Sequence, residues 1–340
     1  MHTRVRFAFP MMLLALACSD GSRAGKADAG SGGASSSGAI RDAAAPVFFT
    51  PDAEVLADEG EGFVLEVPDA SVAMAEEEAE VDALAGLSPI ELHFDVRVGE
   101  QSLRCGERFG PIGEDGLQAE LLHLRFYLHD LYLIGADGKG QEITLAEDGR
   151  FQHDGVALLD FEDGSGRCEE SGNVSENHRI VGGVPAGNYV GLAFKVGVPE
   201  AYNHEDPTEA APPLDLLPMH WSWADGYKFL RIDAREQGGT SFNIHLGSTY
   251  CNFDESLGRV RCERANRAEV VFKAFDPARE RVVLDYGTLL EGIDVVAETP
   301  GCIAGGTPWI CQPLMAAFGI DHATGTADPE LQRAFFAEER

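Results

Sequence analysis

The sequence has few positive charges and lacks the common catalytic signatures. It holds 26 Lys and Arg against 57 Asp and Glu, a formal net charge of −31. A chain this acidic repels phosphate backbones and anionic membrane surfaces, so nucleic-acid binding is excluded. The patterns HExxH, GxSxG, GxxxxGK(S/T) and CxxCH are absent. Their absence disfavours zincins, serine hydrolases of the nucleophile-elbow type, P-loop enzymes and covalent c-type haem carriers.

Long apolar runs are also missing after the N-terminus, so no later segment is expected to span a membrane. Residues 1–18 carry two arginines followed by an apolar run that is too short for a bilayer and is typical of a signal peptide. The run ends in ALAC, the pattern of a bacterial lipobox, with Cys18 as the residue that would carry the lipid. An ordinary secretory signal is the alternative. Either reading predicts an exported protein.

Three further segments are predicted from composition. Residues 19–45 are rich in Gly, Ser and Ala and cannot bury enough apolar surface to fold, so we expect a flexible tether. Residues 46–88 mix apolar patches with an acidic stretch and are expected to form a poorly ordered arm. Docking of a short strand or helix from this arm on the main domain is the alternative. The folded domain is expected over residues 89–340.

Short segments that alternate in polarity or are rich in β-branched and aromatic residues dominate this domain. The predicted strands are Ile90–Val98, Leu121–Leu133, Val156–Phe161, Ile180–Val184, Tyr189–Val196, Lys228–Asp233, Ser241–Leu246, Glu269–Phe275 and Val282–Tyr286. Only Thr288–Asp294 and Gln312–Phe318 have a helical pattern. This density of strands predicts an all-β fold, a β-sandwich of antiparallel strands with long disulfide-tied loops and one or two short helices.

Cysteine usage agrees with export. Apart from Cys18, the cysteines are Cys105, Cys168, Cys251, Cys262, Cys302 and Cys311. An even number in an oxidising compartment suggests disulfides, and six cysteines allow about 15 pairings. Proximity along the chain favours Cys251–Cys262 and Cys302–Cys311, which leaves Cys105–Cys168. A zinc-ribbon site is disfavoured because no CxxC pair exists.

Histidine and tryptophan are the residues left to carry a function. The candidate metal ligands are His93, His204, His220 and His245, and Trp221 and Trp223 flank Ser222. Imidazoles suit copper, but these histidines form a site only if the fold brings them together. The remaining histidines of the folded domain are expected to be solvated: His123, His129, His153, His178 and His322. Read without the fold, each tryptophan is more commonly a core or rim aromatic.

The stretch from about residue 90 to 320 resembles the MbnP-like family of exported copper-binding proteins, known for a WxW motif. The matching segments are Cys105-Gly106, Leu124–Leu128, Val156–Asp163, Gly191–Phe194, Gly197–Pro199, Asn203-His204, Met219–Trp223, Gly226–Asp233 and His245–Thr249. They cover most of the folded domain in order.

The resemblance implies a copper binder, anchored to a membrane through its N-terminal lipid and placed in the periplasm or on the cell surface. In relatives, a MauG-like dihaem enzyme of the bacterial cytochrome c peroxidase type oxidises a tryptophan to kynurenine, which then contributes to the copper site. By position, Trp221 and Trp223 are the candidates for modification. His204 and His245 are the best ligand candidates because they lie inside matching motifs, with His93 as a third and His220 as the reserve. The chain would be the substrate of an enzyme and not itself an enzyme.

Two other functions remain open from the residues alone. A surface β-sandwich could bind a glycan or a protein through the aromatic side chains of Trp221-Ser222-Trp223. Binding of this kind would be insensitive to chelators. A hydrolase using pairs of acidic residues would turn over a substrate without metal.

Overall fold

The computed structural model describes residues 84–171, 175–304, 306 and 308–340. The predicted signal peptide, the predicted lipidation site at Cys18 and the predicted tether fall outside the described residues, as does the acidic arm up to residue 83. Of residues 84–88, predicted as the end of that arm, 84–87 form a turn and Ser88 begins the first strand, and Leu84 and Leu87 lie against Gly183. In the described part of the chain, no helix has the length and apolar character needed to cross a membrane.

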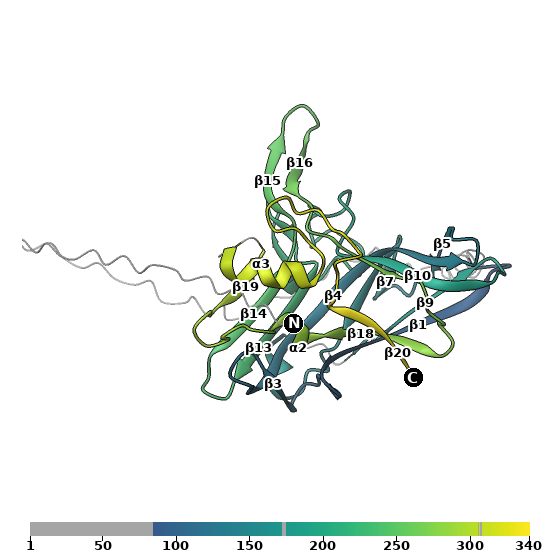
Figure 1. Cartoon of the computed structure of the whole chain (residues 1–340). Helices are drawn as coiled ribbons and strands as arrows, with labels where there is room; N and C mark the ends of the chain where they lie inside the picture. Colours follow the sequence, from purple (N-terminus) through teal and green to yellow (C-terminus); the bar gives the residue numbers. More distant parts are fainter. Residues whose placement is uncertain (1–83, 172–174, 305, 307) are drawn as a thin grey trace, which may run out of the picture. The chain divides into compact units, whose positions relative to one another are not determined.

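Two sheets make up most of this part of the chain, as predicted for an all-β fold (Figure 1). The strands of the larger sheet are β3 (Arg108–Ile112), β4 (Leu117–Gly135), β5 (Gly140–Glu142), β7 (Gln152–His153), β8 (Val156–Asp160), β10 (Tyr189–Val196), β13 (Leu230–Glu236), β14 (Ser241–Leu246), β17 (Ala268–Phe272) and β19 (Gly301–Ile303). The strands of the smaller sheet are β1 (Ser88–Val98), β2 (Gln101–Ser102), β6 (Thr144–Leu145), β9 (Arg179–Val184), β18 (Glu280–Asp285) and β20 (Phe335–Glu339).

The strand order explains how distant segments meet. The larger sheet has the order β17-β10-β4-β13-β14-β19, with β3, β5 and β8 also pairing with β4, and the smaller has the order β20-β18-β1-β9-β6. Most pairs are antiparallel as predicted, but β1–β18 and β14–β19 are parallel. All nine predicted strands are present: β10 and β14 have the predicted bounds, and the other seven differ by a few residues.

The core lies between the two sheets and is filled with aromatic side chains. Phe94 of β1 packs edge-on against Phe194 of β10, with 6.0 Å between ring centroids. Phe335 of β20 contacts Phe194 at 5.7 Å and Phe126 of β4 at 6.3 Å. Because each large buried aromatic removes much apolar surface from water, these contacts between the sheets hold the sandwich together.

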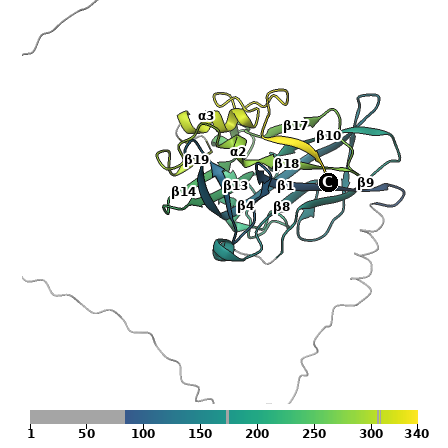
Figure 2. The same cartoon turned by 60° about the horizontal axis from the view of Figure 1, so that its bottom comes forward.

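The helices are short. They are η1 (Gly166–Ser171), η2 (Leu217–Met219), α2 (Tyr286–Leu289) and α3 (Pro308–Ala317). The helix predicted over Gln312–Phe318 is present as α3, which lies beside β19 (Figure 2). The helix predicted over Thr288–Asp294 is misplaced: α2 begins at Tyr286 because the Asp285 carboxylate accepts a hydrogen bond from the Thr288 amide and caps the first turn.

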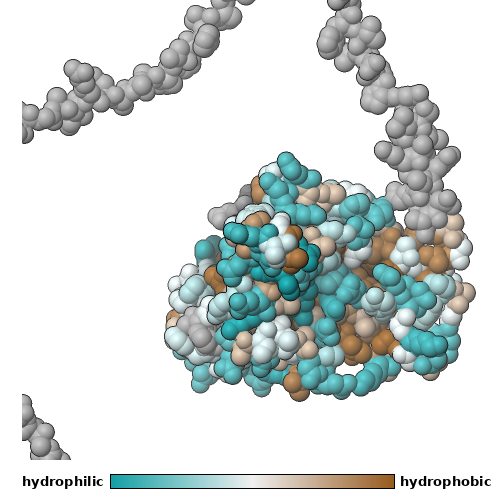
Figure 3. Space-filling model, turned by 90° about the horizontal axis from the view of Figure 1, so that it is seen from above, coloured by the Kyte–Doolittle hydropathy of each residue, from teal (hydrophilic) through white to brown (hydrophobic). Residues whose placement is uncertain are grey.

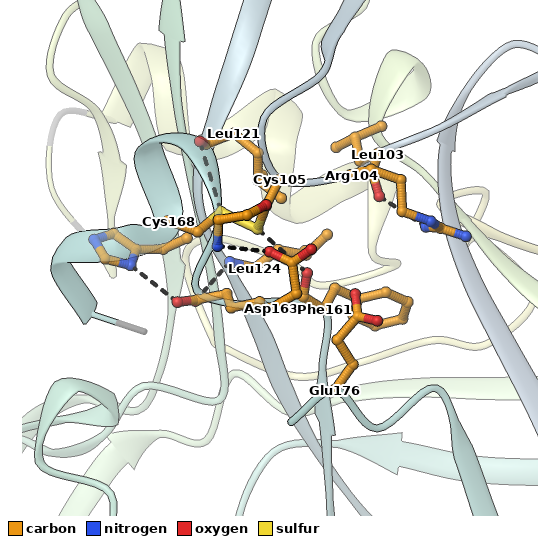
Figure 4. The surroundings of a disulfide bond; sticks show 12 residues. Leu103, Arg104, Cys105, Leu121, Leu124, Phe161, Asp163, Cys168 and Glu176 are labelled. Atoms are coloured by element: carbon orange, nitrogen blue, oxygen red, sulfur yellow. Dashed lines mark hydrogen bonds and ion pairs between the residues drawn. A yellow bond between two sulfur atoms is a disulfide. The ribbon is translucent and has the colours of Figure 1, made fainter. Parts of the chain in front are cut away.

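Three disulfides have the predicted pairings, Cys105–Cys168, Cys251–Cys262 and Cys302–Cys311. The first ties η1 to the loop that precedes β3, beneath the carbonyl of Leu121 (Figure 4). The first and third pairs are buried in the hydrophobic core. Only the second lies outside it, on a separate two-stranded ribbon.

Two small hairpins complete the structure. One joins β11 (His220–Ser222) to β12 (Gly226–Tyr227), and the other joins β15 (Thr249–Asp254) to β16 (Arg259–Arg264). The β15–β16 hairpin stands clear of the two sheets (Figure 1). Seen from the side toward which this hairpin points, the surface is mostly hydrophilic with separate hydrophobic spots (Figure 3). Exposed aromatics near this hairpin include Trp223, Tyr250 and Phe253.

His129, predicted to be solvated, is buried: it is 4% exposed on β4. Burial lowers the pKa of His129 from 6.5 to about 4. Between pH 6.5 and pH 4, His129 therefore binds a proton in the unfolded chain but not in the folded chain. Its contribution to the free energy of unfolding is fully present above pH 6.5 and is lost as the pH falls toward 4. Between pH 7 and pH 5 this amounts to about 2 kcal/mol.

We expect His129→Gln to reduce the loss of unfolding free energy between pH 7 and pH 5 by about this amount, measured by urea denaturation at both pH values. His153→Gln is the matched control, because the His153 side chain is 49% exposed. Equal pH dependence in wild type and His129→Gln would show that burial of this imidazole does not control acid stability.

Candidate metal centre

The Trp-Ser-Trp segment forms the first strand and the turn of the β11–β12 hairpin. Ser222 Oγ donates to Asp225 Oδ2 at 2.7 Å and closes the turn. Gly226 has φ of +78°, and a Cβ there would lie 2.5 Å from the carbonyl oxygen of Asn203. Glycine is therefore required for the hairpin to approach the Asn203-His204 segment.

His204 is held against the turn of this hairpin. Its Nδ1 lies 2.9 Å from the carbonyl oxygen of Trp223. A carbonyl only accepts, so Nδ1 carries the proton and Nε2 carries the lone pair. Nε2 lies 3.1 Å from the Asn203 amide nitrogen and 3.3 Å from Cys262 Sγ. Burial lowers the pKa of His204, which favours the neutral imidazole that metals require.

His245 lies on β14, and its orientation is fixed by a carboxylate on the neighbouring strand. His245 Nε2 donates to Asp233 Oδ1 at 2.6 Å, and Arg231 Nε donates to the other oxygen of Asp233 at 2.8 Å. Burial alone would raise the pKa of Asp233, but the hydrogen bonds from His245 and Arg231 and the positive charge of Arg231 hold it below its usual value. His245 is only 9% exposed, and its Nδ1 is buried with no hydrogen-bond partner among the described residues.

Trp221 lies beside His245, with 6.4 Å between the ring centroids. Lys228 Nζ lies 5.5 Å from the centroid of the Trp221 ring and donates to the carbonyl oxygens of Pro218 and His220. Burial lowers the pKa of Lys228 to about 8. A hollow of about 580 Å³ is lined by Trp221, Asp225, Ser248, Thr249, Tyr250, Ile303 and Ala304. Trp221 is therefore half-buried at the edge of a cavity, next to an imidazole.

Gly247 leaves room for the six-membered ring of the Trp221 indole. A Cβ at Gly247 would lie 2.4 Å from Cζ3 of Trp221 and 2.9 Å from the carbonyl oxygen of Tyr227. We expect Gly247→Ala to displace the indole and to lower the free energy of unfolding by about 1–3 kcal/mol. Near-ultraviolet circular dichroism and urea denaturation would measure both effects.

The control is Gly140→Ala, since an added Cβ there meets Tyr132 at 3.4 Å, an ordinary contact. If the aromatic spectrum and the stability of Gly247→Ala are unchanged, the Trp221 indole does not depend on the space that glycine leaves at position 247.

The two remaining candidate ligands lie in different places. His220, on β11, packs edge-on against Tyr227 at 4.9 Å, and its Nε2 is also buried without a hydrogen-bond partner in the described chain. His93 lies on β1 in the smaller sheet, opposite Arg179, with Nε2 3.0 Å from Glu91. Alternation along β1 places His93 on the face opposite the buried Leu92 and Phe94, so the structure gathers His204, His220 and His245 around the tryptophan pair but not His93.

Three residues of this site were not predicted: Asn203, Lys228 and Asp233. All three lie inside the segments that carry the family resemblance, which was a signal that the sequence offered. Asp233 could have been found from the β13–β14 pairing, in which Arg231 faces His245 and Asp233 is the next residue on the same face. That inference needs the exact strand register.

The site contains imidazole nitrogens that can bind a metal, but the described residues do not surround one point with a full set of ligands. Among the described residues, only one group of three His, Cys, Asp or Glu side chains has its ligand atoms within 4.8 Å of one another: His204, Cys251 and Cys262. The two cysteines of this group are joined as a disulfide. Nδ1 of His245 and Nε2 of His220 are buried without a hydrogen-bond partner among the described residues, so a ligand ion would satisfy them. These donors fit a metal that prefers nitrogen ligands, such as copper.

Comparisons with known proteins identify the family of this chain. The family model named MbnP matches residues 87–304. Among solved structures, MbnP from Methylosinus trichosporium is similar with a TM-score of 0.63 and 28% sequence identity, over 74% of this chain and 98% of that one. No curated protein matches the chain significantly. The chain belongs to the MbnP family.

Proposed function

We propose that this protein is an exported copper-binding protein that holds its metal beside the Trp221-Ser222-Trp223 segment. The observation that carries the proposal is the state of His245. Its Nε2 is tied to Asp233, which leaves a buried Nδ1 lone pair next to Trp221 with no hydrogen-bond partner in the described chain. A histidine bonded to a carboxylate through one nitrogen, with the other nitrogen free, is the usual arrangement of a metal ligand.

His245 through Nδ1 and His204 through Nε2 are the proposed ligands, with His220 Nε2 in reserve. His204 is anchored in a similar way, because its Nδ1 is held by the Trp223 carbonyl, but its Nε2 also lies 3.1 Å from the side-chain amide nitrogen of Asn203. Both histidines therefore lie next to the tryptophan pair, although they are 41 positions apart in the sequence. Copper is the cargo of this site, for acquisition or storage. His93 is not included, because it lies on the other sheet.

A tryptophan oxidised to kynurenine would supply the missing donor. Ring opening of the indole gives an aniline nitrogen and a ketone, so an apolar side chain gains ligand atoms. Trp221 is favoured for this role because it lies beside His245 and lines the hollow. Trp223 is 53% exposed and packs on Phe253 at 5.8 Å, so it is the easier of the two for an enzyme to reach. The proposed enzyme is a MauG-like dihaem protein, with this chain as its substrate.

Export and a lipid anchor complete the proposal. The three disulfides agree with an oxidising compartment. The lipobox at Cys18 would attach the protein to a membrane by an N-terminal lipid.

The test is co-expression with the dihaem enzyme, followed by mass spectrometry and metal analysis. We expect a mass gain of about 4 Da on the peptide with Trp221 and Trp223, because one oxygen is added and one carbon is lost. We also expect stoichiometric copper. Copper with unmodified tryptophans would remove the enzyme from the proposal, and protein without copper would overturn it.

One observation favours a second function. Trp223 and Phe253 form an exposed aromatic pair that could stack on a glycan or dock a protein. Ligand binding that survives chelators and the loss of His204 and His245 would favour this alternative.

Asp233→Asn tests how the site is built. Asparagine keeps the size of the side chain but weakens the hydrogen bond that orients His245, so we expect copper affinity to fall about 10–100-fold. Competition with a copper chelator measures this. The control is Asp137→Asn, at a carboxylate that is 60% exposed and pairs with Lys139. Equal affinities in the two variants would show that Asp233 does not support a ligand.

A further inference from the structure

The Cys251–Cys262 disulfide differs from the other two in its surroundings. Its cysteines are directly opposite each other on β15 and β16, and both are partly exposed. The cysteines of the other two disulfides are at most 8% exposed and belong to the core. A reductant in solution can therefore reach this disulfide and not the others.

An imidazole nitrogen is aimed at the same sulfurs. His204 Nε2 lies 3.3 Å from Cys262 Sγ, and Nε2 and the two Sγ atoms are all within 4.8 Å of one another. His204 Nδ1 is engaged with the Trp223 carbonyl, so the lone pair is on the nitrogen that faces the sulfurs. Sulfurs joined to each other are poor metal ligands, whereas thiolates are strong ligands for soft ions.

We propose that His204, Cys251 and Cys262 form a redox-gated site for a soft monovalent ion, copper(I), which opens when this disulfide is reduced. A dithiol reductant donates two electrons and two protons: the S–S bond breaks, two thiols form, and the reductant becomes a disulfide. One copper(I) ion then binds the two sulfurs and the imidazole as the thiol protons leave to solvent. The site needs neither His245 nor a modified tryptophan, and it shares only His204 with the site proposed above.

The fold keeps the three ligands together after reduction. The pairs Thr249–Arg264, Asn252–Arg261 and Phe253–Val260 align the two strands on either side of the cysteines, so the thiols stay opposite each other. The cysteines are separated by only 11 positions, so little chain is released. Because the hairpin stands outside the core, the β-sandwich does not depend on this bond (Figure 1).

The experiment titrates copper(I) into the full chain, oxidised or treated anaerobically with a phosphine reductant, in competition with a chromogenic copper(I) chelator. Alkylation and peptide mass spectrometry identify the reduced cysteines. We expect reduction to open Cys251–Cys262 alone and to add about one tight copper(I) equivalent. Reduction without any added copper binding would overturn the proposal.

Variants assign the ligands. The Cys251→Ser, Cys262→Ser double variant and His204→Ala should each lose the added equivalent, whereas His153→Ala, at an exposed histidine, should keep it. If the double variant does not fold, wild-type protein reduced and then blocked with a maleimide replaces it, and retention of the equivalent there would contradict the assignment. Copper bound by the oxidised chain is measured separately, so failure of the site at His245 and failure of this one give different results.

Discussion

Replacing both His204 and His245 with alanine is expected to abolish stoichiometric copper binding by the oxidised protein while leaving the β-sandwich folded. Each of the two substitutions removes an imidazole with one nitrogen already engaged, by the Trp223 carbonyl for His204 and by Asp233 for His245. Neither histidine belongs to the hydrophobic core. Metal analysis gives the copper content, and far-ultraviolet circular dichroism confirms the fold.

His93→Ala is the matched control for the double variant. His93 was expected as a third ligand, but it lies on β1 beside Glu91 and Arg179, so its loss should leave copper unchanged. If the double variant retains copper and His93→Ala loses it, the ligand assignment is wrong while the family assignment stands.

The second large effect concerns stability. Arg125 is 1% exposed on β4, with Nε 2.9 Å from Asp160 and Nη1 3.1 Å from Glu162, and both carboxylates are fully buried. Arg125→Met leaves two buried carboxylates without their shared cation. We expect the free energy of unfolding to fall by about 3–5 kcal/mol, measured by urea denaturation at pH 7.

Two controls separate charge from packing. Lys139→Met, at an ion pair whose lysine is 84% exposed, should change stability by less than about 1 kcal/mol. Adding Asp160→Asn and Glu162→Gln to Arg125→Met should restore much of the loss, because the uncompensated charges are gone. Equal stabilities of Arg125→Met and Lys139→Met would show that the buried cation is not needed.

The fold was predictable where the chain alternates over a buried face. β14 was predicted with its exact bounds, because Phe242, Ile244 and Leu246 alternate with polar residues. β15 and β16 were missed because they project from the sheets and are mostly exposed, so no apolar alternation marks them. The short pairing of Cys251 with Cys262 was predicted from proximity, but its contact with His204 was not.

The sequence predicted most of the histidines and both tryptophans of the candidate site, but not the hydrogen bonds that orient them. The resemblance placed His204 and His245 in matching motifs, and the structure brings both to the tryptophan pair. Asp233 was missed because its approach to His245 depends on register: a slip of one residue in the β13–β14 pairing would put them on opposite faces. His93 was placed with the ligands because a sequence does not say which of two sheets a strand joins.

The most direct measurement is an anomalous diffraction map at the copper edge from crystals of the oxidised, copper-loaded protein. The proposed function predicts one strong peak bonded to Nδ1 of His245, beside residue 221 and on the side away from Asp233. A strong peak at His93 or among surface carboxylates, with His245 Nδ1 still unbound, would contradict it.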